Sequence, residues 1–218
     1  MVRHTTRLAG LVALALVIGH GSAWAGPPLL CHPFDIAGAA SLPWDGANGW
    51  SHGRADYDVR TLAADTGKLL TPSTPIVVRM ETLRRAALYA TRDAAVARQV
   101  LDLLNERARR GAGSADNALA LFDAGYYVET MRQIGMLGGE SAYRTIAPLF
   151  REAVAGLDGF ALVKKSSSMR TNEPAIEFAA ALIASSVERA SYAQHAAKAR
   201  QGAAADTLLA RNIQQIAN

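Results

Sequence analysis

Apolar residues recur at intervals of three and four positions between residues 74 and 110, and this spacing predicts two consecutive α-helices. Their apolar faces carry Ile76, Met80, Leu83 and Ala87 in the first helix, and Val96, Val100, Leu103 and Leu104 in the second. Thr74 and Thr91 are the expected N-cap residues, with Pro75 in the first turn and Gly111 behind the second helix. Because two antiparallel helices cannot bury these faces alone, further helices should pack against them.

The same periodicity continues after this pair. Residues 114–134 carry apolar side chains on two faces, which is typical of a central helix with neighbours on both sides. Two glycines at 138 and 139 should stop that helix. Residues 141–157 predict another helix, which either kinks at Pro148 or begins near Thr145, because proline lacks a backbone donor.

The C-terminal third contains one expected loop and two expected helices. The run of two lysines and three serines at 164–168 predicts a loop by its composition. Asn172 and Pro174 start a long alanine-rich helix, whose apolar positions are Ile176, Ala180, Ile183 and Val187. A last helix carries Leu208, Leu209, Ile213 and Ile216. Strand signals are nearly absent along the whole chain.

These patterns predict an all-α fold in which helical hairpins stack as a short array or an irregular bundle, with residues 74–218 as the helical domain. In architecture, residues 74–157 resemble the helical-hairpin repeat proteins of the tetratricopeptide and HEAT types. The resemblance implies a groove that receives a peptide or a protein. The tetratricopeptide residue pattern itself is not reproduced around residues 122–126, and the hairpins are not evenly spaced.

Residues 26–73 are expected to form an irregular N-terminal arm. Four prolines and five glycines between residues 26 and 53 leave no room for a long helix or a central strand. Large apolar residues in the same stretch are costly to leave in water, so the arm should lie along the helices with its Trp and Phe side chains inserted. A short helix is expected over Tyr57–Thr66, capped by Asp56 and ended by Gly67.

Residues 1–25 have the three parts of a secretory signal peptide. Arg3 and Arg7 flank the start of an apolar run over 8–19, and the sequence Ala23-Trp24-Ala25 provides small residues at the positions before cleavage. The run is shorter than the about 20 apolar residues that span a bilayer. The sequence therefore predicts Sec-type export, cleavage after Ala25, and a periplasmic or secreted product.

Charge and hydropathy limit the partners of the mature chain. The net charge of +4 falls to +2 when Arg3 and Arg7 are removed, and the remaining charges are dispersed. A nucleic-acid-binding protein needs a clustered basic face, and an integral membrane protein needs a second long apolar run. We expect neither class. Solvated helix faces are expected for Arg84, Arg85, Arg107, Arg109 and Arg110.

The arm also holds the densest set of side chains that can bind metals or transfer protons. Cys31 and His32 are adjacent, and Asp35, His52 and Asp56 follow. One hypothesis is a small metal site at His32, His52 and Asp56, or a Cys–His nucleophile pair. The spacing matches no metal-binding motif, and a single cysteine forms no intrachain disulfide. A packed arm with capping aspartates is the alternative, and it requires no metal or other cofactor.

A second resemblance concerns Gly139-Glu140-Ser141, which is similar to the Glu-Ser stretch around the catalytic acid of lytic transglycosylases. The resemblance implies that Glu140 protonates a glycosidic oxygen. The Gly-Leu-Met-Gln stretch of those enzymes is replaced here by residues 143–146. A carboxylate after two glycines also suits the first turn of a helix.

Taken as a sequence, the chain favours an exported, non-enzymatic binding or scaffold protein of the bacterial cell envelope. Its partner would be an envelope protein or peptide. The expected ligand-binding residues are Tyr127, Arg132 and Lys164 on the helices, and Trp44 and Trp50 on the arm. The alternative is a small periplasmic enzyme or metal-binding protein that uses the Cys, His and Asp residues of the arm.

Overall fold

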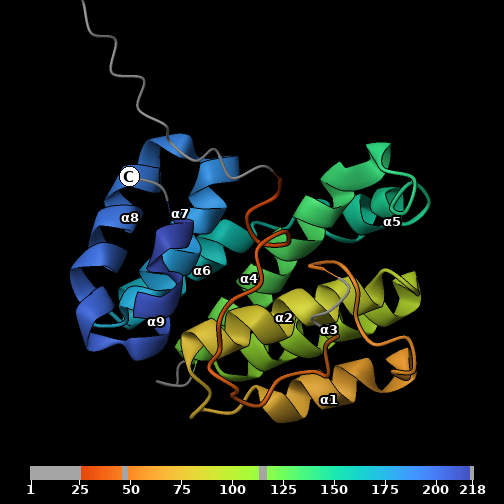
Figure 1. Cartoon of the computed structure of the whole chain (residues 1–218), viewed down its shortest axis with the longest axis horizontal. Helices are drawn as coiled ribbons and strands as arrows, with labels where there is room; N and C mark the ends of the chain where they lie inside the picture. The colour runs from red at the N-terminus through yellow and green to blue at the C-terminus, as the bar shows by residue number, and fades with distance from the viewer. Residues whose placement is uncertain (1–25, 46–48, 113–116, 217–218) are drawn as a thin grey trace, which may run out of the picture.

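The structure, a computed structural model, describes residues 26–45, 49–112 and 117–216 (Figure 1). Every regular element within these residues is helical, which confirms the predicted all-α fold. The α-helices are α1 (Leu62–Leu69), α2 (Ile76–Ala90), α3 (Ala94–Arg110), α4 (Asn117–Met136), α5 (Ile146–Ala153), α6 (Gly159–Met169), α7 (Pro174–Val187), α8 (Arg189–Gly202) and α9 (Thr207–Asn212). Short 3-10 turns are η2 (Val59–Thr61), η3 (Leu137–Gly139), η4 (Ala203–Ala205) and η5 (Ile213–Gln215).

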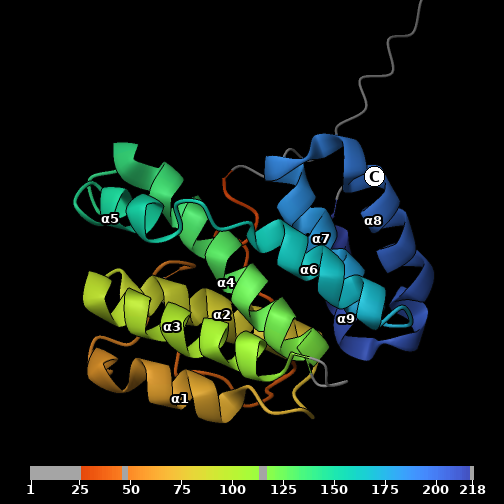
Figure 2. The ribbon, with the colours of Figure 1, turned by 180° about the vertical axis from the view of Figure 1, so that it is seen from behind.

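The helices form two groups joined by α4. Helices α1, α2 and α3 lie side by side in one group, and α7, α8 and α9 lie together in the other (Figures 1 and 2). Helix α4 packs against α2, α3, α5, α6 and α7, and its side chains are buried on almost every face. This confirms the central position that its two apolar faces predict.

Two glycines allow α4 and α6 to approach each other closely. A Cβ atom on Gly125 would lie 2.4 Å from the carbonyl oxygen of Gly159, and one on Gly159 would lie 2.5 Å from that of Gly125. No side chain fits at either position without moving a backbone. The sequence therefore fixes where these two helices cross, and α6 in turn carries one wall of the pocket described below.

The N-terminal arm is ordered against the helices, as its apolar residues predict. Leu29, Leu30 and Leu42 are fully buried, and Phe34 meets Phe178 of α7 edge to face at 6.0 Å. The amide of Leu29 donates to Gln133 of α4. Through these contacts the arm joins both helix groups. Trp44 and Trp50 are half-buried rather than fully inserted.

A buried ion cluster on α2 holds the arm in place. The side chains of Glu81 and Arg84 are both 0% exposed, and Glu81 accepts bonds from Arg84, from Arg85 and from the amide of Phe34. Arg84 also donates to two arm carbonyls, and Arg85 donates to a third. The expectation that these two arginines lie on a solvated face was therefore wrong. Their hydrogen bonds are made with the arm instead of with water.

Several helix ends differ from the prediction. Thr74 donates to the carbonyl of Leu69 and does not cap α2, whereas Asp93 rather than Thr91 caps α3 by accepting from the amide of Ala95. Asp93 has the same capping chemistry as Thr91 and lies closer to the first apolar turn. In the arm, Asp58 instead of Asp56 caps η2.

Three other boundaries follow the sequence or correct it. Helix α3 ends at Gly111 and α5 begins after Thr145, both as expected. The short arm helix continues through Gly67 to Leu69. Residues 164–168 are not a loop but lie inside α6, which Asp158 caps by accepting from the amide of Ala161.

Helices α7 and α8 form a tight hairpin with Glu188 between them. Gly202 near the end of α8 lies against Pro174 at the start of α7, because a Cβ atom on Gly202 would be 2.4 Å from that ring. The two helices therefore run antiparallel, with matching residues face to face. The sequence patterns left α8 unassigned.

No helix in the described part of the chain is long and apolar enough to cross a membrane. Residues 1–25 lie outside the described residues, so cleavage after Ala25 and export remain predictions.

Candidate functional site

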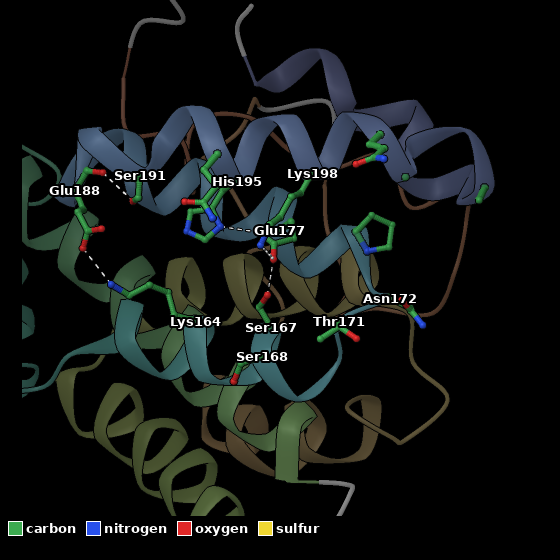
Figure 3. Close-up of a pocket in the computed structure, with 15 residues that line it drawn as sticks. Lys164, Ser167, Ser168, Thr171, Asn172, Glu177, Glu188, Ser191, His195 and Lys198 are labelled. Carbon is green, nitrogen blue, oxygen red and sulfur yellow. Dashed lines mark hydrogen bonds and ion pairs between the residues drawn. The ribbon is translucent and has the colours of Figure 1, made fainter.

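A polar pocket of about 770 Å³ lies between α6, α7 and α8 (Figure 3). Its volume is in the range of small-molecule sites. Most residues of its wall carry hydroxyl, amide or charged side chains, and the principal ones are Lys164, Ser167, Ser168, Asn172, Glu177, Glu188, Ser191, Gln194, His195, Lys198 and Gln201. These residues come from α6, α7 and α8 and from the short connections between them.

Glu177 of α7 is the centre of the hydrogen-bond network in this pocket. Its side chain is 9% exposed. One carboxylate oxygen, Oε2, lies 2.6 Å from Nδ1 of His195, and the other, Oε1, accepts from the Ser167 hydroxyl at 2.5 Å. Burial disfavours the charged form, but the bonds from His195 and Ser167 outweigh it and lower the pKa of Glu177 to about 2. Glu177 is therefore ionised at neutral pH.

The ionised carboxylate determines which nitrogen of His195 carries a proton. A carboxylate without a proton can only accept, so Nδ1 of His195 must be the donor in the 2.6 Å contact. In the neutral ring Nε2 is then the acceptor, and in the protonated ring it is a second donor. The His195 side chain is 10% exposed, and its ring meets Phe160 of α6 edge to face at 5.8 Å.

Two lysines border the network. Nζ of Lys198, on α8, donates to Oε1 of Glu177 at 3.3 Å, and its side chain is 51% exposed. Nζ of Lys164, on α6, forms an ion pair with Glu188 at 3.0 Å and lies 4.4 Å from the centre of the Phe160 ring. In Figure 3 this ion pair spans from α6 to the α7–α8 junction at one end of the pocket.

The arrangement suits binding better than covalent catalysis. Ser167 donates to Glu177 and not to His195, so the order of contacts in a Ser-His-acid triad is absent from this pocket. What the pocket offers instead is a fixed set of donors and acceptors from hydroxyl, amide and ammonium groups. Such groups fix the orientation and identity of a polar ligand.

The structure separates the expected ligand-binding residues. Lys164 lines the polar pocket, and it also lines a neighbouring hollow of about 440 Å³ together with Arg132. Arg132 is held there by Glu129 and by the carbonyl of Leu157. Tyr127 is 0% exposed and its hydroxyl donates to the carbonyl of Ala97, so it belongs to the core and lines no groove. Tyr127 is buried because other helices cover α4 on almost every face.

The two arm tryptophans lie away from this pocket. Trp44 lines a shallow hollow of about 420 Å³ with the exposed Arg54–Asp56 ion pair, and the Arg84 guanidinium lies 5.0 Å from its ring centre. Trp50 contributes its carbonyl to Arg84. Both tryptophans therefore help to fasten the arm, and neither meets Lys164 or Arg132 at one site.

The metal hypothesis receives no support from the geometry of the arm. Among the described residues, which include His32, His52 and Asp56, no three His, Cys, Asp or Glu side chains are grouped so that they could hold a metal ion. Asp56 pairs with Arg54, and His52 is next to the Ser51 hydroxyl at 3.0 Å. Burial raises the pKa of the Cys31 thiol, which disfavours the thiolate that a nucleophile needs.

Glu140 does not have the surroundings of a catalytic acid either. It is exposed, immediately after η3, whereas a glycosidase acid is buried so that it stays protonated. It also precedes α5 by several residues and so lies outside the first turn of that helix.

Sequence patterns gave no indication of Glu177, His195 or Lys198. Glu177 lies in an alanine-rich helix whose positions 175–184 are all buried. The sequence feature that could have pointed to it is a single glutamate within an otherwise apolar run. A buried carboxylate requires a partner, but the sequence does not say which residue supplies it.

Comparisons of the chain with models of protein families, with curated proteins and with solved structures found no match. The function must therefore be inferred from the pocket itself.

Proposed function

We propose that this chain is an exported, non-enzymatic binding protein of the bacterial cell envelope, and that it holds a small polar ligand in the pocket between α6, α7 and α8. The observation that supports this proposal is the buried network of Glu177, His195, Ser167 and Lys198 at the pocket wall. Polar groups fixed in this way pre-organise a site, which lowers the entropic cost of binding.

The ligand fits one of two descriptions. A pocket of about 770 Å³ accommodates a small free molecule or one end of an envelope peptide, and not an extended chain. Export is the second part of the proposal, and the signal-peptide pattern of residues 1–25 supports it. No cofactor and no nucleic acid is required.

Thermal unfolding with defined additives tests the binding proposal. The purified protein is heated with sodium succinate, sodium phosphate, glycine, glucose or triglycine, each over a range of concentrations. At least one additive should raise Tm progressively, since a ligand at 100 times its Kd stabilises the folded state by about 2.7 kcal/mol.

A pair of variants links any shift in Tm to this pocket. Ser168→Trp places an indole at the rim and should abolish the shift, whereas Lys165→Trp adds the same group on α6 outside the pocket and should retain it. The proposal fails if no additive raises Tm, or if the two variants respond alike. Export is tested separately, because the protein recovered from a bacterial periplasm should begin at Gly26.

A further inference from the structure

We infer that the ligand of this pocket carries an oxyanion, a carboxylate or a phosphate group, which is bound by Nζ of Lys198 and Nε2 of His195. The inference rests on the proposed binding function and adds the chemistry that the ligand must have.

The first step concerns Glu177, whose carboxylate oxygens already accept hydrogen bonds from side chains of the protein. Its Oε2 is engaged by His195, and its Oε1 accepts from both Ser167 and Lys198. A carboxylate with three donors already in place has little capacity left for a cationic ligand. The central acid of the pocket therefore positions two basic groups.

The second step concerns the donors that remain. Lys198 directs one N–H to Glu177 over a long 3.3 Å contact, and an ammonium group has three, so two are left for a ligand. His195 has its Nδ1 occupied, which leaves Nε2 at the pocket wall, where it donates to an oxyanion when the ring is protonated. Because residues three apart on a helix are neighbours, Lys198 and His195 present these groups on the same face of α8.

The third step concerns the other residues on that face of α8. Ser191, Gln194 and Gln201 also line the pocket. The Ser191 hydroxyl already donates to the carbonyl of Glu188, but the two glutamine amides can donate to an oxygen-rich group. This face of α8 therefore adds two amide donors to the basic pair.

The fourth step is the balance of charge around His195. The charged groups that face it are Glu177 from α7, Lys198 from α8, Lys164 from α6, and Glu188 from the α7–α8 junction. The two carboxylates and the two ammonium groups cancel. Protonation of His195 therefore gives the pocket a net charge of +1 and turns Nε2 into a donor.

Calorimetric titration at constant ionic strength tests the inference. Sodium succinate and sodium phosphate are the anionic probes, and glucose and glycine are the uncharged and zwitterionic comparisons, each at pH 7.0. We expect one of the two anions to bind at least about tenfold more tightly than glucose or glycine, which corresponds to about 1.4 kcal/mol. Which anion binds distinguishes the carboxylate from the phosphate source.

Three variants test whether Lys198 and His195 bind the anion. Lys198→Met should weaken anion binding because it removes the ammonium group, and His195→Gln should weaken it because it removes the imidazole ring. Lys165→Met, which removes an exposed charge outside the pocket, should leave anion binding unchanged. Circular dichroism and the urea midpoint of each variant show whether it is folded.

The possible outcomes separate the two proposals. If glucose or glycine binds and both anions fail, the oxyanion inference is overturned while the binding function stands. If no probe binds, both are overturned. Anion binding that Lys198→Met and His195→Gln leave unchanged is non-specific, and it overturns the inference as well.

Discussion

Removal of the buried carboxylate of Glu81 should strongly weaken the fold. Glu81→Gln preserves the shape of the side chain but removes its charge. In the structure this carboxylate accepts from Nε of Arg84 at 2.8 Å, from Nη2 of Arg84 at 2.9 Å, from Nε of Arg85 at 2.7 Å, and from the amide of Phe34 at 3.0 Å. Both Glu81 and Arg84 have 0% exposed side chains, so water cannot replace the lost contacts.

The expected cost follows from the charge that is left behind. Removing one partner of a buried ion pair typically costs 3–5 kcal/mol, because the other charge stays buried and uncompensated. Arg84 retains two arm carbonyls as acceptors, so we expect about 3 kcal/mol, the lower end of that range. This is a large part of the roughly 5–15 kcal/mol by which domains are stable.

The chain supplies a matched control for this variant. Glu106 forms ion pairs with Arg109 and Arg110, three and four residues on, with the same spacing as Glu81 with Arg84 and Arg85. It lies on the surface, and exposed pairs contribute between about 0 and 1 kcal/mol. Urea unfolding followed by circular dichroism should therefore give a far smaller loss for Glu106→Gln. Equal losses for the two variants would refute the claim that burial of the Glu81 cluster fastens the arm.

Two further predictions concern the α4–α6 contact and the pocket. Gly125→Ala should lower the free energy of unfolding by about 2 kcal/mol, because its Cβ would meet the Gly159 carbonyl, whereas Gly139→Ala meets no atom within 4 Å and should be nearly neutral in the same urea titration. In the wild type, Glu177 has a pKa lowered from 4.5 to about 2, so its contribution is complete above pH 4.5 and is lost as pH falls toward 2. The wild type should therefore lose about 3 kcal/mol of unfolding free energy between pH 5 and pH 2, and Glu177→Gln should not show this loss. A variant that loses the same amount would contradict the lowered pKa of Glu177.

Helix positions were predictable where burial alone sets the pattern. The stripe predicted for α2 is buried, but so is the rest of that helix except Arg85, and the double stripe of α4 matches a helix that is buried on almost every face. In α3 the predicted positions are buried except Leu103, which is partly exposed. Termini that depend on one residue type, such as Gly111, were also predictable. The caps at Thr74 and Thr91 were not, because several nearby residues offer the same capping oxygen.

Composition was misleading at α6, where two lysines and three serines suggested a loop. In the structure Phe160, Val163 and Ser166 are buried, one helical turn apart. Their packing against α4 outweighs the weak helix propensity of serine, which is a few tenths of a kcal/mol per residue. Tertiary contacts therefore decide this segment, and they are not visible in the local sequence.

The two Glu-x-x-Arg-Arg segments show a second limit of sequence patterns. Both 81–85 and 106–110 have a glutamate followed by arginines three and four residues later, and both predict a solvated helix face. The first is buried because the arm covers it, and the second is exposed. The difference is set by arm residues that are distant in sequence, among them Leu30, Phe34 and Leu42, so no pattern within either helix could reveal it.

The pocket is hidden from the sequence for a geometrical reason. Glu177 and His195 are 18 residues apart. In one continuous helix with a rise of 1.5 Å per residue they would be separated by roughly 27 Å. They lie 2.6 Å apart because the chain reverses at Glu188, whose extended φ of −149° breaks the helix without a glycine or a proline to mark it. A chain that continued as a helix through Glu188 would have every pocket residue and no pocket. The reversal at Glu188 is therefore what brings the two halves of the site together.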